Sequence, residues 1–208
     1  MCRCNIHLFT VLNSMENKTN NRVKILNAAW KLFEEKGYDN TTVDEIIEAT
    51  DTSKGTFYHY FKSKEDLLSL FSYMFDERYE ELSKKLDVDM NSFDKLLVLC
   101  DECFNSIEND YSLDLVARMY SAHLFSKNQK HLMDKNRTYY KLLRNVIAEG
   151  QQRGHIRDDM SPAEIIKMYT IAERALVYDW CVCNGEYSLR EYGCRMMALY
   201  LYKIKENE

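Results

Sequence analysis

Proline and glycine are scarce in this chain, which has one proline and six glycines among 208 residues. Strand-rich folds use these residues at their many turns, so the scarcity favours long helices. Long apolar runs are missing too, since none approaches the roughly 18 residues of a membrane-spanning helix. Because 46% of the residues are hydrophobic, the chain can bury the cores of one small and one larger domain. The sequence therefore predicts an all-α fold.

Motifs of the common catalytic sites are also absent. The chain has no glycine-rich phosphate loop, no G-x-S-x-G and no H-E-x-x-H. His123, His131 and His155 have no obvious set of catalytic partners, and Asp158-Asp159 is typical of a solvated loop. We therefore predict that the chain is not an enzyme, with no catalytic residue and no cofactor.

Seven cysteines stand at irregular spacings, which favours reduced thiols in the cytoplasm over a disulfide scaffold. Cys100 and Cys103 would share one helix face. Cys181 and Cys183 would point about 200° apart on a helix and would not chelate one ion. Zinc needs converging ligands, so no metal site is predicted and burial as small hydrophobes is favoured. Whether the cysteines sense a metal or a change in redox state is left open.

Acidic side chains are missing from one segment of an otherwise acidic chain. The net charge is −5, and residues 65–208 carry 19 basic and 25 acidic side chains. Residues 16–64 are neutral, yet the segment from Ser53 to Lys64 contains three lysines and no acid. Net charge alone disfavours a nucleic-acid partner, but an acid-free segment suits a helix that faces DNA.

The same region has the pattern of a helix-turn-helix. A first helix is expected over residues 22–36, ended by Gly37 in a left-handed conformation. Thr42-Val-Asp-Glu45 is a capping box that opens the second helix. Asp51-Thr52 forms the turn, and Ser53 caps the third helix, which would be the recognition helix.

The recognition helix predicts a set of DNA contacts. Gly55 has no side chain and permits a close approach, while Thr56 can bond to a base or touch a thymine methyl group. Lys54 and His59 can reach base edges or phosphates, and helix N-termini add amide donors. The full predicted set is Thr42, Ser53, Lys54, Gly55, Thr56, Tyr58, His59, Tyr60 and Lys64. The alternative is an ordinary amphipathic helix with a solvated face.

Further capping signals divide the rest of the chain into helices. They are expected over residues 63–86, 92–108, 112–125, 128–153, 161–183 and 188–205, with capping boxes at Ser63 and Ser161 and with Ser188-Leu-Arg-Glu191 opening the last helix. The predicted organisation is an N-terminal arm (1–21), a helix-turn-helix domain (22–67) and a helical ligand-binding and dimerisation domain (68–208). Because Met15 starts a polar stretch that leads into the first helix, we hypothesise that it is the natural start.

The larger domain is expected to dimerise and to hold a ligand. The two last helices are apolar on more than one side, so they would pack on their own domain and on a partner chain. One recognition helix reads few base pairs, so a two-fold dimer on a palindromic site is expected. Candidate pocket residues are Met119, Tyr120, His123, Tyr139, Tyr169 and Glu173. Core filling is the alternative for each, and Glu173 could instead pair with Arg174 or Arg118.

Residues 25–68, ILNAAWKLFEEKGYDNTTVDEIIEATDTSKGTFYHYFKSKEDLL, resemble the DNA-binding head of the tetracycline-repressor family of bacterial regulators. The matching elements include Lys36-Gly37-Tyr38 and the run from Ser53 to Tyr58. Asp51-Thr52 and Ile47 depart from the usual residues of the family. The resemblance covers about a fifth of the chain. It implies an all-helical homodimer that binds a palindromic operator, usually as a repressor, and releases DNA when a small-molecule ligand binds the larger domain.

Two functions follow from these patterns. The first is a dimeric, ligand-responsive transcriptional repressor. The second is an interaction module or co-activator that keeps the helix-turn-helix but acts through another protein. Dependence of binding on salt would distinguish them, because direct binding to DNA releases counterions.

Overall fold

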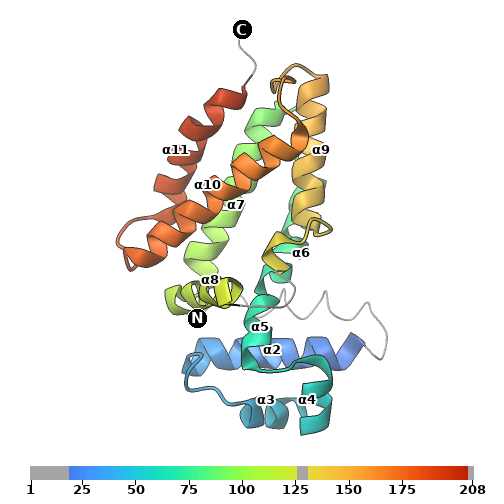
Figure 1. Ribbon diagram of the computed structural model, residues 1–208, viewed down its shortest axis with the longest axis vertical. Coiled ribbons are helices and arrows are strands. Elements are labelled where there is room, and N and C mark those ends of the chain that lie inside the picture. The colour runs from blue at the N-terminus through green and yellow to red at the C-terminus, as the bar shows by residue number, and fades with distance from the viewer. Residues whose placement is uncertain (1–18, 126–130, 206–208) are drawn as a thin grey trace. The chain divides into compact units, whose positions relative to one another are not determined.

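The computed structural model describes residues 19–125 and 131–205 (Figure 1). The chain separates into two compact units between Leu70 and Phe71. We call residues 19–70 the head and the described residues from 71 to 205 the body. Met15 lies outside the described residues. Within them, all regular structure is helical apart from an isolated bridge between Ile156 and Lys205, which confirms the all-α prediction. None of the described helices is long and apolar enough to cross a membrane.

The head is built on a small aromatic and aliphatic core. Its helices are α2 (Thr19–Lys36), α3 (Val43–Thr50), α4 (Lys54–Tyr60) and α5 (Lys64–Ser69). Ile25 and Phe33 of α2 are buried together with Ile46 of α3 and Phe57 of α4. Each such side chain contributes roughly 1.5–3 kcal/mol on burial, so the core fixes α3 and α4 against α2.

Left-handed residues end two of the head helices, as the sequence predicts for Gly37. Gly37 follows α2 with φ +81°, and Asp51 follows α3 with φ 50° and ψ 45°. The Thr50 hydroxyl lies within bonding distance of the Ile46 carbonyl (2.9 Å) and of the Thr52 hydroxyl (2.8 Å). Thr52 therefore has a polar partner in the turn.

The predicted helix over residues 63–86 is wrong in two respects. Ser63 makes no side-chain cap; instead the Asp66 carboxylate accepts the Lys62 amide at 2.7 Å. The helix is also divided, because the Leu70 amide bonds to the Leu67 carbonyl three residues back and tightens the last turn.

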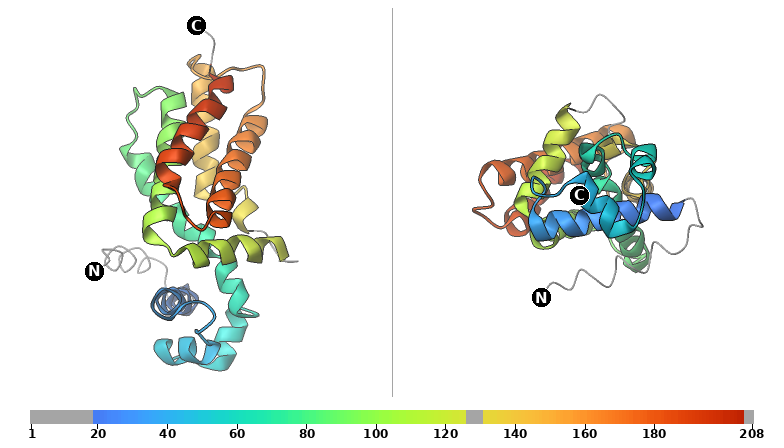
Figure 2. Two further views of the ribbon diagram at one scale, coloured as in Figure 1. Left: turned by 90° about the vertical axis from the view of Figure 1, so that its left-hand side faces the viewer. Right: turned by 90° about the horizontal axis from the view of Figure 1, so that it is seen from below.

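The body is a helical bundle. Its elements are α6 (Phe71–Lys85), α7 (Ser92–Asp110), α8 (Leu113–Phe125), η3 (His131–Met133), α9 (Thr138–Gln152), α10 (Pro162–Val182), α11 (Leu189–Leu201) and η4 (Tyr202–Ile204). Helices α7, α9, α10 and α11 run along one another, and α8 crosses their ends (Figures 1 and 2). The capping box at Ser161 is confirmed, with the Ser161 amide donating to Glu164 at 2.9 Å.

One predicted helix cap and one predicted helix start in the body are wrong. The cap of α7 is Asn91 rather than Ser92, because the Ser92 amide donates to Nδ1 of His155 (3.2 Å). The helix expected from residue 128 begins only at Thr138, although residues 126–130 lie outside the described ones. The guanidinium of Arg137 is held by Asp76, whose carboxylate also accepts the Tyr139 amide at 3.1 Å. These bonds replace the contacts that would continue the helix backwards.

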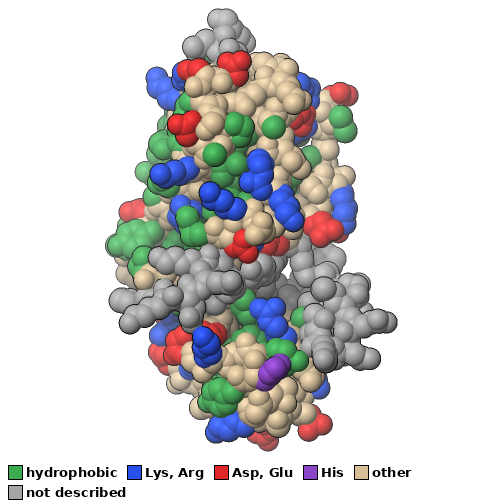
Figure 3. Space-filling view, turned by 45° about the vertical axis from the view of Figure 1, so that its right-hand side comes forward, with side chains coloured by type: hydrophobic (Ala, Val, Ile, Leu, Met, Phe, Trp, Pro, Cys, Tyr) green, Lys and Arg blue, Asp and Glu red, His purple; other side chains and the backbone are tan. Residues whose placement is uncertain are grey.

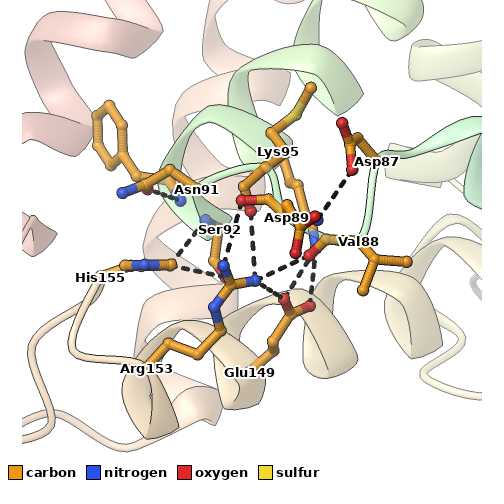
Figure 4. Close-up of polar contacts among 11 residues, drawn as sticks. Asp87, Val88, Asp89, Asn91, Ser92, Lys95, Glu149, Arg153 and His155 are labelled. Carbon is orange, nitrogen blue, oxygen red and sulfur yellow. Dashed lines mark hydrogen bonds and ion pairs between the residues drawn. The ribbon is translucent and has the colours of Figure 1, made fainter.

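A cluster of polar contacts, which we call the clasp, joins the connection between α6 and α7 to the C-terminal end of α9 (Figure 4). It is formed by Lys95, Glu149, Arg153 and the Val88 carbonyl. The Lys95 ammonium is 2.8 and 3.0 Å from the two carboxylate oxygens of Glu149 and 3.3 Å from the Val88 carbonyl. Arg153 bonds to Glu149 (2.6 Å) and to the Val88 carbonyl (2.9 Å). Two cations thus fix the connection to α9.

Candidate DNA-binding surface and effector site

Two capped helices form the predicted helix-turn-helix. The Ser53 hydroxyl accepts the Thr56 amide at 3.0 Å and so begins α4. Thr42 begins α3, with its hydroxyl accepting the Glu45 amide (3.2 Å) while the Glu45 carboxylate accepts the Thr42 amide (2.8 Å). Lys36 donates to the same carboxylate at 2.7 Å. The Lys36 bond and the two Thr42 bonds lower the pKa of Glu45 to about 2.

The recognition helix α4 presents a polar and aromatic surface. Lys54 and His59 are exposed, as is 49% of Tyr58. The rings of His59 and Tyr60 meet edge to face at 4.8 Å. Lys54 forms an ion pair with Asp44 of α3 at 3.0 Å, with both side chains exposed. An exposed pair of this kind is screened by solvent and contributes little stability, so Lys54 can be released to DNA at little cost.

Gly55 and Thr56 lie at the start of α4. The Thr56 hydroxyl is 2.8 Å from the Ser53 hydroxyl, and either can be the donor. A Cβ built at Gly55 would meet only Ser53 Oγ, at 3.7 Å, within the described chain. Nothing in the fold of the head therefore requires glycine at this position.

Lys64 occupies a different environment from the other lysines. Its ammonium donates to the backbone carbonyls of Tyr38 (2.6 Å) and Thr41 (2.8 Å) and lies 4.1 Å from the centre of the Tyr38 ring. An ammonium group has three N–H donors, and two of them are used here. Lys64 thus ties the start of α5 to the connection between α2 and α3, and its phosphate contact stays a prediction.

The body contains a buried carboxylate at Glu173 of α10. Its side chain is 7% exposed, and the Tyr139 hydroxyl donates to its Oε2 at 2.5 Å. Oε1 is buried and has no hydrogen-bond partner among the described residues. Burial raises the pKa of Glu173 above its usual range, which favours the protonated acid. The sequence pointed to Glu173 because it interrupts an apolar helix. It did not indicate Tyr139, rather than Arg174 or Arg118, as its hydrogen-bond partner.

Other predicted pocket residues have defined partners. Tyr169 is fully buried, and its hydroxyl donates to the Leu96 carbonyl at 3.1 Å. His123 is buried; its Nε2 accepts the Leu132 amide at 3.2 Å, so Nδ1 is the nitrogen that donates to the Met119 carbonyl at 2.8 Å. His123 therefore fastens η3 to α8. The Met119 side chain is buried, and burial raises the pKa of Tyr120.

Two residues near Glu173 were missed by the sequence analysis as pocket candidates. The Cys103 thiol lies close enough to Glu173 and Tyr79 to influence their pKa values, and the Tyr79 ring lies 5.0 Å from that of Tyr139. Their positions on the inner faces of α6 and α7 follow helical spacing. Spacing alone does not show that two helices converge on one carboxylate, so the sequence could not assign them.

Apolar side chains are exposed on the last two long helices. On α10 they are Ile171, Tyr178 and Val182, which lie seven and four residues apart on one face. On α11, Leu199 is 65% exposed and Tyr200 45%. A helix that is apolar on its outer side as well as its inner side is suited to pack against a second chain.

The structure thus defines a class: a helix-turn-helix head joined in one chain to a helical body with a buried polar cluster. Residues 25–70 match the family described as bacterial regulatory proteins, tetR family, and residues 71–202 match the YsiA-like protein, C-terminal region. The chain belongs to the tetR family and is a DNA-binding transcriptional regulator. Regulators of this family bind operator DNA as dimers and respond to small-molecule effectors.

Individual relatives agree with this assignment. The fatty acid metabolism regulator protein of Bacillus subtilis is 26% identical over 178 residues, covering 84% of this chain and 91% of the relative. The transcriptional repressor KstR2 of Mycobacterium tuberculosis is 22% identical, covering 86% and 90%. These relatives are transcriptional regulators and not enzymes.

Two solved structures share the fold. FadR of Bacillus subtilis, in complex with stearoyl-CoA, has a TM-score of 0.66 and 24% identity, covering 87% of this chain and 98% of that one. FadR of Thermus thermophilus, in complex with lauroyl-CoA, has a TM-score of 0.70 and 20% identity, covering 90% and 96%.

Proposed function

We propose that the chain is a repressor released from its operator by a long-chain acyl-CoA. Its DNA contacts are those predicted on α3, α4 and their caps, while Lys64 at the start of α5 holds the connection between α2 and α3. The observation that carries the effector class is the similarity to the fatty acid metabolism regulator protein of Bacillus subtilis, which extends over 84% of this chain. It is supported by the two acyl-CoA complexes among the structures that share the fold. We also propose that it acts in the cytoplasm and catalyses no reaction.

The body's chemistry is compatible with such an effector. An acyl chain needs an apolar interior, which α7, α9 and α10 provide with Leu99, Leu143 and Val177. A thioester carbonyl needs a hydrogen-bond donor, and the protonated form of Glu173 supplies one through the buried Oε1. Binding there would satisfy an oxygen that has no partner in the described structure.

The phosphates of coenzyme A need basic side chains near the mouth of the site. Lys141 and Arg144 are exposed on α9 and Lys167 on α10, and these two helices pack together. Lys and Arg side chains also gather on the face of the body shown in Figure 3. We assign Lys141 and Arg144 to phosphate binding, one turn apart on the same helix.

The test starts from operator DNA recovered by selecting genomic fragments with the purified protein at physiological salt. Stearoyl-CoA, stearate and coenzyme A are then each titrated into the complex. We expect stearoyl-CoA to weaken DNA binding at least tenfold at concentrations where the other two have little effect. If none of the three changes DNA binding, the proposed effector is wrong while the DNA-binding function stands.

A pair of double variants locates the effector site. Lys141→Ala with Arg144→Ala should raise the stearoyl-CoA concentration needed for release and leave affinity for DNA unchanged. Lys84→Ala with Lys85→Ala removes two exposed cations from the end of α6 and serves as the control. Equal responses from both double variants would reject phosphate binding by Lys141 and Arg144.

A further inference from the structure

Helices α7 and α11 approach each other closely where two cysteines meet. A Cβ added at Gly193 would lie 2.6 Å from the ring of Phe104, so only glycine allows this approach. One residue further along α11, Cys194 Sγ lies 3.6 Å from Oδ1 of Asp101. Cys194 therefore faces α7, and Cys100, the neighbour of Asp101, lies on the same part of that helix.

The two thiols lie close enough for each to influence the pKa of the other. Cys100 is fully buried, and burial raises the pKa of its thiol, so it keeps its proton. Interaction with Cys100 lowers the pKa of the Cys194 thiol below its ordinary value. Asp101 opposes this shift and Arg190 favours it, as expected from their charges. Cys194 is only half-buried whereas Cys100 is fully buried, so Cys194 is the sulfur that an oxidant meets first.

Only one of the two sulfurs can be reached from solvent. Cys194 lines a surface hollow of about 400 Å³, together with Arg190, Ser188 and Glu191. Arg190 stands over the hollow and bonds to Asp101 at 2.7 and 2.8 Å. A small uncharged oxidant can therefore meet Cys194, whereas Cys100 lies behind it.

We propose that Cys194 and Cys100 are a peroxide-sensitive thiol pair that closes to a disulfide between α11 and α7. The Cys194 thiolate attacks a peroxide: an S–O bond forms, the O–O bond breaks and hydroxide leaves, taking up a proton to become water. Cys100 sulfur then attacks Cys194 sulfur, forming the S–S bond, while the Cys100 proton passes to the departing oxygen and a second water leaves. The two thiols are oxidised together by two electrons and the peroxide is reduced.

The other described cysteines lack this combination of contacts. Cys103 is buried and its thiol is engaged with Glu173 and Tyr79. Cys181 has a pKa raised by burial to about 11, and that of Cys183 is raised by desolvation and by the charges of Asp179 and Glu186. A raised pKa leaves little thiolate at neutral pH, so peroxide should select Cys194.

The test uses the full-length protein, folded and reduced, treated with hydrogen peroxide and digested without reductant. Mass spectrometry should find a linked peptide containing Cys100 and Cys194, which disappears on reduction. In Cys100→Ala the second step is blocked, so dimedone should label Cys194 as the sulfenic acid. Cys194→Ser should yield neither product.

A control double variant tests whether the disulfide is specific to Cys100 and Cys194. Cys181→Ser with Cys183→Ser removes two partly exposed thiols on α10 and its end and should leave formation of the linked peptide unchanged. Circular dichroism of each variant shows that it is folded. The proposal is overturned if folded Cys100→Ala gives no dimedone adduct at Cys194, or if wild-type Cys100 pairs with Cys103 instead.

Discussion

At the scale of single residues, a substitution at Gly55 should affect DNA binding without destabilising the fold. Among the described residues, a methyl group at this position meets only the Ser53 hydroxyl, and alanine is favoured over glycine in a helix by about 1 kcal/mol. We predict that Gly55→Ala leaves the melting temperature unchanged or raised. We also predict at least a tenfold loss of operator affinity, about 1.4 kcal/mol, because the methyl group holds α4 away from the groove.

Parallel melting and DNA-binding titrations check this prediction. Gly150→Ala is a contrasting variant, because its Cβ would lie 2.6 Å from Ile156 and should destabilise the body. An unchanged operator affinity in Gly55→Ala would mean that α4 does not approach DNA closely at this residue.

Glu45 gives the head a predictable dependence on pH. Its pKa is lowered to about 2, from an ordinary value of 4.5, by Lys36 and Thr42. A lowered carboxyl pKa stabilises the folded head above pH 4.5, and this contribution is lost as the pH falls towards 2. Glu45→Gln should therefore unfold more easily than wild type at pH 7, with the difference shrinking between pH 4.5 and 2. Urea unfolding followed across that range measures it, and a constant difference would contradict the assignment.

The sequence identified individual functional candidates, but it did not identify the residues to which they hydrogen-bond. The signal at Glu173 was its place in an apolar helix, which requires only local spacing. Its bond to Tyr139 joins residues 34 positions apart and depends on how α9 packs on α10. The same holds for Lys64, whose charge is evident from the sequence while its two carbonyl partners are set by the fold.

At the scale of helices, local capping signals predicted ends where no distant residue competed. Thr42 and Ser161 form the expected boxes because every bond in each box is made within four residues. The cap expected at Ser92 and the helix start expected at residue 128 are not found, for the opposite reason. His155 takes the amide of Ser92, and Asp76 takes the amide of Tyr139, over separations of 63 residues. Such competitors cannot be read from a local pattern.

The clasp in Figure 4 predicts energetic coupling between α7 and α9. Lys95 is only 5% exposed and bonds to both oxygens of Glu149. Lys95→Met and Glu149→Gln should each destabilise the body, and the double variant should cost less than the sum. We expect a coupling energy of about 1–2 kcal/mol.

Urea unfolding of the four proteins in this double-mutant cycle gives the coupling. The exposed pair Lys84–Glu81, at 2.7 Å on α6, is the control and should show a coupling of a few tenths of a kcal/mol at most. Equal coupling in the two cycles would show that burial of Lys95 adds nothing to the clasp.

At the scale of the whole molecule, the head and the body depend on sequence in different ways. The head's function is carried by a contiguous segment, so its pattern could be predicted from residues 42–64. The body gathers its buried cluster from Tyr79, Cys103, Tyr139 and Glu173, which lie on four different helices. The class of regulator therefore follows from the head, whereas the effector must be tested on the intact protein.

The dimer as a whole should show a salt dependence that counts its lysine–phosphate contacts. Each contact contributes about −0.9 to the slope of log K against log salt concentration. With Lys54 and Lys62 from both chains the slope is about −3.6, and adding Lys64 would make it about −5.4. Because the Lys64 ammonium already bonds to two carbonyls, we predict the smaller value.

Two lysine variants decide between these counts. Lys62→Met removes an exposed cation at the end of the recognition segment and should reduce the slope to about −1.8. Lys64→Met should lower operator affinity by loosening the start of α5, yet leave the slope at about −3.6 because no phosphate contact is lost. Titrations from low to physiological salt measure both. If Lys64→Met reduces the slope as much as Lys62→Met does, Lys64 must exchange its two carbonyl bonds for a phosphate when the head binds DNA.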